Sequence, residues 1–263
     1  MDAGLPNRSR RNKQGYQGDS IPVDDLLMRL LNESAHCGWV SESLPLEKND
    51  SLLFLHRDSN TQLPKIFISA GIHGNEPATT LAICDLIQSD LLPKTFSYFI
   101  FPCMNPRGMR LSIRETPEGK DLNRDYLGEE TGEVQTQLRK IKSVDQFELA
   151  LLLHEDWESS GFYLYELTKP DTPPRFGPKV LDAVSKICPI ETSAQIDGLE
   201  ASKGLIHPPY HLNQRTDWPE AFYLMRHKTN HSLTLESPSD FDMQVRIDAL
   251  KTSVLTAVEM LVK

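Results

Sequence analysis

The sequence lacks any uncharged apolar run close to the roughly 18 residues that a membrane-spanning helix needs. Its N-terminus has basic residues, but no apolar segment of the kind found in secretory signal peptides follows them. It also lacks CxxC pairs, because its cysteines are scattered at Cys37, Cys84, Cys103 and Cys188. Thiols in apolar stretches act as small hydrophobes. We therefore expect a cytoplasmic protein with reduced cysteines and no membrane partner.

Positive charge is also in short supply. The 263 residues include 28 Lys and Arg against 37 Asp and Glu, which gives a net charge of −9 and a pI of about 5.4. A non-specific nucleic-acid binder needs a basic surface that releases counterions, so we expect no nucleic-acid partner. Hydrophobic residues make up 39% and charged residues 25%, as in an ordinary globular protein. The composition leaves the oligomeric state open.

The polar N-terminus differs from the rest of the chain. Residues 1–20 have too little apolar surface to offset the entropy of ordering, so we expect a flexible arm there. Residues 21–263 carry strand and helix patterns without an internal repeat, and we expect them to form a single domain.

Short apolar segments typical of strands alternate with amphipathic segments typical of helices. The main expected strands span residues 65–72, 96–104, 147–153, 161–167 and 232–236. A capping box of Ser239 and Asp242 is expected to open the last helix. The alternation predicts the α/β class, with a mixed, largely parallel twisted sheet and helices on both faces.

Side chains with metal-binding chemistry follow two of the expected strands. His73 and Glu76 follow strand 65–72, and His154 follows strand 147–153. Ligands bind outside the carboxyl ends of strands in open α/β sheets, so we expect these side chains to meet at one edge. Two histidines, one glutamate and a water form a known catalytic zinc set. The alternative is that both histidines are hydrogen-bonded polar caps of their strands.

Further candidates belong to the same predicted edge. Glu236 closes an apolar strand, where a carboxylate must be hydrogen-bonded, paired or catalytic, and beside a metal it is a candidate general base. The loop after strand 96–104 carries Arg114, a candidate for stabilising an oxyanion. In the same loop, Asn123 and Arg124 offer a fork for a substrate carboxylate. The alternative for the arginines is an ordinary solvated surface.

Other constellations are weaker. His207 with His211, and His227 with His231, have zinc-like spacing. Prolines within the first pair prevent a shared helix face, and neither pair has an evident third ligand. The chain has no G-x-S-x-G, G-x-x-x-x-G-K-[ST] or G-x-G-x-x-G motif, so serine hydrolases, P-loop proteins and dinucleotide-binding enzymes are not indicated.

Six ordered pieces of the sequence resemble the M14 metallocarboxypeptidase family, and within it the small bacterial branch that includes murein peptide amidases. The resemblance runs from about Trp39 to the C-terminus. The pieces are His73-Gly-Asn-Glu76, Asn105-Pro106-Arg107-Gly108, Arg114, Asp121-Leu-Asn123-Arg124, His154 and Glu236. The resemblance implies a zinc carboxypeptidase-like fold for residues 21–263.

The resemblance also implies a metal site. One zinc ion would be held by His73, Glu76 and His154, and Glu236 would be the general base. Asp121 would be the carboxylate that orients His73, a partner that metal-bound histidines usually have.

Substrate contacts follow from the resemblance in the same way. Arg114 would polarise the scissile carbonyl, while Asn123 and Arg124 would hold the free C-terminal carboxylate. The family has a mobile tyrosine over its site, and Tyr210 is the candidate ahead of Tyr223.

The function implied by the resemblance is zinc-dependent removal of a C-terminal residue from a short peptide with a free carboxylate, as in carboxypeptidases or murein peptide amidases. The main alternative is an N-acyl amino acid deacylase of the aspartoacylase and succinylglutamate desuccinylase type, which is similar in the HGNE and DLNR pieces. The longer spacing from Arg114 to Asp121, and the 27 residues after Glu236, favour the peptidase. A catalytically silent peptide-binding module is less favoured, because no ligand or base is missing.

The residues after His154 depart from the family pattern, because Glu155, Asp156 and Trp157 stand where many relatives carry small residues. The favoured interpretation of Glu155 and Asp156 is solvated loop charges. The alternative is attraction of a cationic substrate amine, such as that of lysine or diaminopimelate. Residues 195–220 align poorly, so the preferred substrate side chain stays open.

Overall fold

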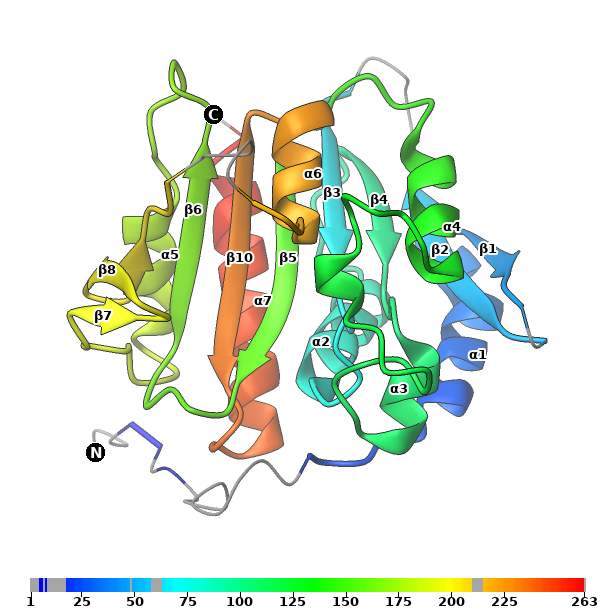
Figure 1. The fold of residues 1–263 in the computed structure, drawn as a ribbon, viewed down its shortest axis with the longest axis horizontal. Coiled ribbons are helices and arrows are strands. Elements are labelled where there is room, and N and C mark those ends of the chain that lie inside the picture. Colours follow the sequence, from blue (N-terminus) through cyan, green and yellow to red (C-terminus); the bar gives the residue numbers. More distant parts are fainter. Residues whose placement is uncertain are drawn as a thin grey trace.

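A mixed β-sheet forms the centre of the computed structural model, which describes residues 5–6, 8, 18–47, 49–57, 63–209 and 215–262 (Figure 1). Among these residues the sheet has ten strands, in the order β1-β2-β4-β3-β5-β10-β6-β9-β8-β7. The strands are β1 (Val40–Pro45), β2 (Ser51–Arg57), β3 (Lys65–Ser69), β4 (Ser97–Phe101), β5 (Leu149–Asp156), β6 (Tyr163–Thr168), β7 (Gln195–Ile196), β8 (Leu199–Ser202), β9 (Leu205–Ile206) and β10 (His231–Pro238).

The middle of the sheet is parallel. β3 pairs in parallel with β4 and with β5, and β5 pairs in parallel with β10. Antiparallel pairs flank this centre, namely β1 with β2, β2 with β4, and β6 with β10. Parallel strands covered on both faces are apolar along their length, and every residue of β5 except Asp156 is buried. The predicted mixed sheet is confirmed.

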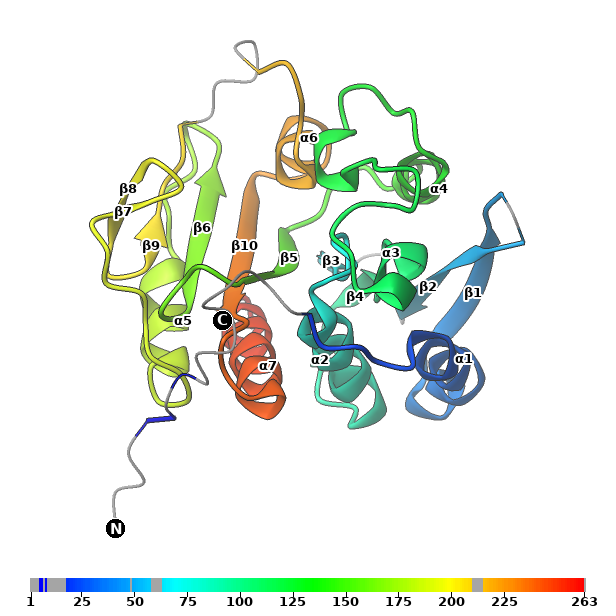
Figure 2. The ribbon, with the colours of Figure 1, turned by 60° about the horizontal axis from the view of Figure 1, so that its bottom comes forward.

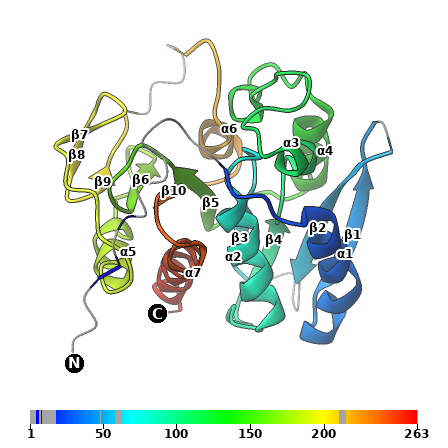
Figure 3. The same ribbon diagram turned by 90° about the horizontal axis from the view of Figure 1, so that it is seen from below.

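Helices cover both faces of the sheet, as predicted (Figures 2 and 3). One face packs against α1 (Val23–Glu33), α2 (Pro77–Gln88), α5 (Gly177–Val184) and α7 (Met243–Glu259). The other face packs against α4 (Gly132–Ile141) and α6 (Glu220–His227). The short helix α3 (Pro106–Leu111) follows β4, and 3₁₀ turns occupy Ser34–Cys37 and Leu122–Arg124.

Alternation along the central strands decides which side chains face the site. Leu153 of β5 and Leu235 of β10 contribute to the core under α2 and α7. Successive side chains of a strand point to opposite faces, so His154 and Glu236 point toward the α6 face. The parallel register sets Glu236 directly beside His154. Two groups 82 residues apart in the sequence are thereby neighbours in the sheet.

Two features differ from the sequence prediction or were not foreseen. α7 begins at Met243 with Asp242 as its N-cap and no side-chain capping bond, so the predicted capping box is wrong. Ser239 lies instead in the preceding turn, where its backbone N–H donates to the carbonyl of Asp156 at 2.9 Å. The short strands β7, β8 and β9 extend the sheet beyond β6 and had no clear sequence signal.

Some residues of the N-terminal segment contact the folded body. Arg8 Nε lies 2.8 Å from Asp240 Oδ2, and its Nη1 donates to Ser160 Oγ at 2.9 Å. Asp19 forms an ion pair with Arg246 of α7. The flexible arm and the single-domain boundary at residue 21 stay predictions, since most of residues 1–17 lie outside the described ranges. None of the helices found in the described ranges is both long and apolar enough to span a bilayer.

Candidate metal centre

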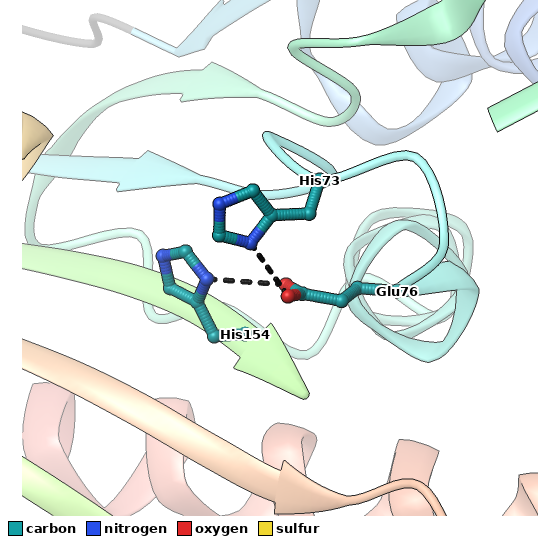
Figure 4. Close-up of side chains that lie close together, drawn as sticks. All are labelled: His73, Glu76 and His154. Atoms are coloured by element: carbon teal, nitrogen blue, oxygen red, sulfur yellow. Dashed lines mark hydrogen bonds and ion pairs between the residues drawn. The ribbon is translucent and has the colours of Figure 1, made fainter. Parts of the chain in front are cut away.

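Three buried side chains converge at the carboxyl end of β3 and β5 (Figure 4). His73 Nδ1 lies 2.6 Å from Glu76 Oε1, and His154 Nδ1 lies 3.1 Å from Glu76 Oε2. His73 and Glu76 come from the turn between β3 and α2, whereas His154 belongs to β5. One potential ligand atom from each residue lies within 4.8 Å of the others. The structure thus brings together all three predicted metal ligands.

The turn that holds His73 requires a glycine. A Cβ atom on Gly74 would lie 2.1 Å from the carbonyl carbon of Gly108, so no side chain fits between this turn and α3. Asn105 fixes the other side of the contact: its Oδ1 accepts the N–H of Gly108 at 2.8 Å, and its Nδ2 donates to the carbonyl of Arg114 at 3.2 Å. The close packing therefore positions both the metal-binding turn and the segment bearing Arg114.

The donor set of this triad fits a zinc ion. Two imidazole nitrogens and one carboxylate are ligands of catalytic zinc sites, which keep another position open for water or substrate. All three side chains are at most 6% exposed and face one another, so a cation would compensate the buried carboxylate. Burial alone would raise the pKa of Glu76, but His73 and His154 outweigh it and lower the pKa to about 2. The triad is a metal-binding site consistent with zinc.

Asp121 joins His73 to Arg114. Its Oδ1 lies 3.4 Å from His73 Nε2, the nitrogen that faces away from Glu76, and its Oδ2 lies 3.1 Å from Arg114 Nη2. Burial opposes ionisation of Asp121, but the interactions with His73, Arg114 and Arg124 hold its pKa well below the usual range. The carboxylate is therefore an anion next to His73, and its predicted role in orienting that side chain stays a prediction.

Glu236 lies next to His154 in the neighbouring strand. No side chain of the described residues donates a hydrogen bond to its carboxylate, whereas its backbone pairs with both β5 and β6. Burial raises the pKa of Glu236 to about 8; His154 opposes this shift, and the charge of Glu76 adds to it. A divalent cation in the triad would act in the opposite direction and favour the ionised carboxylate. Its charge state is thus sensitive to the metal.

A pocket of about 640 Å³ opens beside the triad and contains most of the predicted site residues. Its lining includes His73, Glu76, His154, Glu236, Arg114, Asn123 and Arg124. Asn123 Oδ1 accepts the backbone N–H of Glu220 at 2.8 Å, which ties it to the start of α6. Arg124 is partly exposed and lies 3.7 Å from Asp217 Oδ2. The roles given to these residues stay predictions.

The opposite wall of the pocket was not foreseen from the sequence. It includes Tyr163 and Tyr165 of β6, whose hydroxyls donate to Asp156 Oδ2 at 3.1 Å and to Asp197 Oδ2 at 2.7 Å. Tyr163 also pairs with Glu236 across the sheet. Two tyrosines at positions i and i+2 of one strand share a face, and this was the available signal. Arg215 and Trp157 line the pocket as well.

Glu155 and Asp156 have different environments. The carboxylate of Glu155 is fully buried and pairs with Arg246, with Arg246 Nη1 to Glu155 Oε1 at 2.8 Å. Both interpretations offered for Glu155 are therefore wrong, because it is neither a solvated charge nor free to bind a substrate amine. Asp156 lines the pocket, so the amine interpretation survives there.

Several other candidates lie elsewhere or outside the described residues. Tyr210 and His211 belong to the undescribed segment 210–214. Tyr223 packs between Tyr126 and His227, with ring centroids 6.0 and 4.7 Å away. His231 does not pair with His227 around a metal, since its Nε2 lies 2.7 Å from Glu166 Oε1. Of the described residues, His73, Glu76 and His154 form the one group arranged to hold a metal ion.

Two comparisons of the sequence with known proteins find partial matches. Residues 62–172 match the family model of the succinylglutamate desuccinylase/aspartoacylase catalytic domain. Murein peptide amidase A of Escherichia coli K12 is 28% identical over 85 residues, which cover 32% of this chain and 35% of the amidase. The match thus spans about a third of that relative's length.

Solved structures support the fold. The crystal structure of a proposed metallopeptidase from Shewanella amazonensis has a TM-score of 0.78 at 22% identity and covers 91% of this chain and 93% of its own. A metallo-carboxypeptidase from Pseudomonas aeruginosa, in complex with (2-guanidinoethylmercapto)succinic acid, has a TM-score of 0.63 at 15% identity. The match covers 89% of this chain and 68% of that carboxypeptidase. The fold is carboxypeptidase-like. The chain is thus similar in fold to carboxypeptidases, and one segment of it is similar in sequence to the succinylglutamate desuccinylase/aspartoacylase catalytic domain.

Proposed function

We propose that this metallohydrolase of the carboxypeptidase superfamily removes the C-terminal residue from a short peptide with a free carboxylate. The observation that carries the proposal is Glu236, a carboxylate without a hydrogen-bond donor among the described side chains, set beside His154 of the buried triad. Its side chain is half-buried in the pocket lining, and partly desolvated carboxylates with a raised pKa cluster at functional sites. Arginines in the same pocket supply contacts for anionic substrate groups.

The proposed mechanism divides the chemistry between the triad and the pocket side chains. A zinc ion held by His73, Glu76 and His154 would supply Lewis-acid chemistry that polarises the carbonyl and makes water more acidic. Glu236 accepts the proton of the attacking water and later delivers it to the leaving amine. Arg114 stabilises negative charge as it develops on the carbonyl oxygen. Asp121 holds the orientation of His73 throughout.

The substrate carboxylate is assigned to Asn123 and Arg124. A guanidinium group can bind a carboxylate with two parallel hydrogen bonds. Arg215 also lines the pocket, and its Nη2 lies 3.3 Å from Asp217 Oδ1. Arg124 approaches the other oxygen of the same carboxylate. Binding of a substrate anion would give both arginines a second acidic partner besides Asp217. The proposed substrates include muropeptide fragments, in line with the similarity to a murein peptide amidase.

A deacylase is the second candidate function. The observation that favours it is the match of residues 62–172 to the succinylglutamate desuccinylase/aspartoacylase catalytic domain. Both reactions hydrolyse an amide near a carboxylate, so the same residues serve either substrate. We also propose a cytoplasmic location, as expected from the reduced cysteines; all four thiols are free.

Product analysis by mass spectrometry tests the proposal. Zinc-loaded protein is incubated with free-acid peptides, their C-terminal amides, muropeptide fragments ending in diaminopimelate, and N-acyl amino acids. Release of single C-terminal residues from free acids, but not from amides, is the expected result. Cleavage of the N-acyl amino acids with untouched peptides would establish the deacylase instead. Zinc binding without any product would contradict both and leave a peptide-binding module.

A further inference from the structure

Glu155 follows a proposed metal ligand along β5 but points to the other face of the sheet. His154 faces the pocket, and strand alternation directs Glu155 toward α2 and α7. Its side chain is 0% exposed, so its carboxylate is closed to substrate. The partners of that carboxylate therefore lie within the fold.

One oxygen of Glu155 binds the segment that carries the other two ligands. Its Oε2 accepts the backbone N–H of Ala78 at 2.8 Å, two residues after Glu76 and in the first turn of α2. The first N–H groups of a helix have no partner within the helix and favour an anion. The backbone pairing between β3 and β5 ends at Ser69 and Leu152. It therefore stops before the turn that holds His73 and Glu76, and before His154 on β5. Glu155 thus links the two segments beyond the end of the ladder.

The second oxygen of Glu155 is held by a buried arginine. Arg246 of α7 is 0% exposed, and its Nη1 donates to Glu155 Oε1 at 2.8 Å. Its Nη2 pairs with Asp19 of the N-terminal segment. Well-packed apolar residues often replace buried ion pairs without loss of stability, so such a pair is weak evidence for a stabilising role. Its directional hydrogen bonds do, however, fix the position of Glu155.

We propose that the buried Glu155–Arg246 pair is a positioning device that sets the separation between His154 and Glu76 and so tunes the affinity of the triad for its metal. Neither residue contacts the metal or the substrate. Glu155 acts through the backbone of the preceding residue, His154, and through the first turn of α2 behind Glu76. This role rests on the proposed function, because it presumes that the triad holds a metal ion.

The test is metal affinity in three variants. Glu155→Gln removes the charge and keeps the shape. The double variant Glu155→Leu with Arg246→Met replaces the pair by apolar side chains, which guards against a fold lost to one unpaired buried charge. Glu166→Gln is the matched control, since Glu166 also holds N–H groups at a helix start, those of Phe176 and Gly177, far from the triad.

Zinc affinity is measured by competition with a chromophoric chelator, and ligand geometry by the visible absorption of the cobalt(II) form. We expect the Glu155 variants to bind zinc more weakly, by at most the roughly 10- to 100-fold that follows the loss of a direct hydrogen-bond partner of a metal ligand, and to have a changed cobalt spectrum. Glu166→Gln is expected to match the unmodified protein. A folded double variant with unchanged affinity and spectrum would overturn the positioning role. Failure of the unmodified protein to bind zinc or cobalt would overturn the proposed function itself.

Discussion

The two ends of the β6–β10 pair each hold a glutamate, and the two carboxylates have opposite environments: Glu166 is buried, whereas Glu236 is half-buried and lines the pocket. At the end away from the pocket, Glu166 Oε1 accepts the N–H groups of Arg175 and Phe176, both at 2.9 Å, and lies 2.7 Å from His231 Nε2. Burial alone would raise the pKa of Glu166, but His231 and the backbone donors outweigh it and lower the pKa to about 2. This end is a closed, fully paired site.

At the pocket end, Glu236 has the reverse arrangement. Burial raises its pKa to about 8, and no described side chain donates to its carboxylate. Within the part of the chain that the structure describes, several donors satisfy the buried Glu166 at one end of this strand pair, whereas no side chain donates to Glu236 at the other. A general base works best when its pKa lies near the working pH, so a raised pKa suits a carboxylate that accepts and releases protons. The difference is consistent with a structural role for Glu166 and with the proposed role of Glu236 as the general base.

Glu236→Gln is expected to have the largest effect of the changes considered. Loss of the general base should lower kcat/KM by roughly 10²- to 10⁴-fold, because positioned acid–base groups contribute that much. Steady-state kinetics on the released amino acid measures the change, and zinc affinity checks that the site still loads. Without metal, this variant should be at least as stable as the unmodified protein, since it removes a poorly solvated carboxylate. Full turnover by a zinc-loaded variant would refute the assigned base.

Glu166→Gln breaks the other half of the comparison. It should lower the free energy of unfolding at pH 7 by about 3 kcal/mol, because it weakens the hydrogen bonds that the charged carboxylate accepts from His231 and from backbone N–H groups, while zinc affinity stays the same. The folded pKa of Glu166 lies below its ordinary value, so its contribution is present above about pH 4.5 and is lost as the pH falls toward about 2. Urea unfolding between pH 2 and 7 should show a shallower acid limb in the variant. If the acid dependence of unfolding were the same in the variant and the unmodified protein, Glu166 would not be a stabilising carboxylate.

Asp121→Asn tests a carboxylate of intermediate character, partly exposed but paired. Its loss should weaken zinc binding by roughly 10- to 100-fold through misorientation of His73. Competition with a chelator measures the effect. The reference is Asp90→Asn, which changes the same charge where Asp90 pairs with Arg57 at 3.0 Å, away from the pocket. Equal affinities in both variants would mean that Asp121 does not orient the ligand.

The sequence predicts the parts of the site that follow from strand ends. His73, Glu76, His154 and Glu236 all come at the end of apolar segments, and carboxyl ends of parallel strands meet at one edge. The central sheet and its flanking helices follow from hydrophobic periodicity, which is strong in buried strands. The strand-end argument and the periodicity argument both use local sequence patterns. The structure contains the sheet and the cluster of strand-end side chains that they predict.

Local sequence patterns do not show which residues far apart in the chain contact one another. The position of Glu155 between charged neighbours suggests a solvated loop, whereas its partner Arg246 lies 91 residues away on α7. The contact between Tyr165 and Asp197 joins β6 to the turn after β7, a strand of two residues that periodicity does not detect. Such contacts depend on the packed fold, so sequence reasoning missed them.

Asp156→Asn gives the smallest predicted effect and extends the comparison to specificity. Asp156 lies in the pocket wall, where it accepts the Tyr163 hydroxyl, and burial raises its pKa. If its charge attracts a cationic substrate group, the variant should lose about 5-fold in kcat/KM on peptides ending in lysine or diaminopimelate, which corresponds to ~1 kcal/mol for a partly screened charge pair. Peptides ending in neutral residues should be unaffected. Asp145→Asn, an exposed change of the same charge outside the pocket lining, controls for the overall field of the protein. Equal losses on both substrate classes would assign Asp156 to support of Tyr163 rather than to substrate choice.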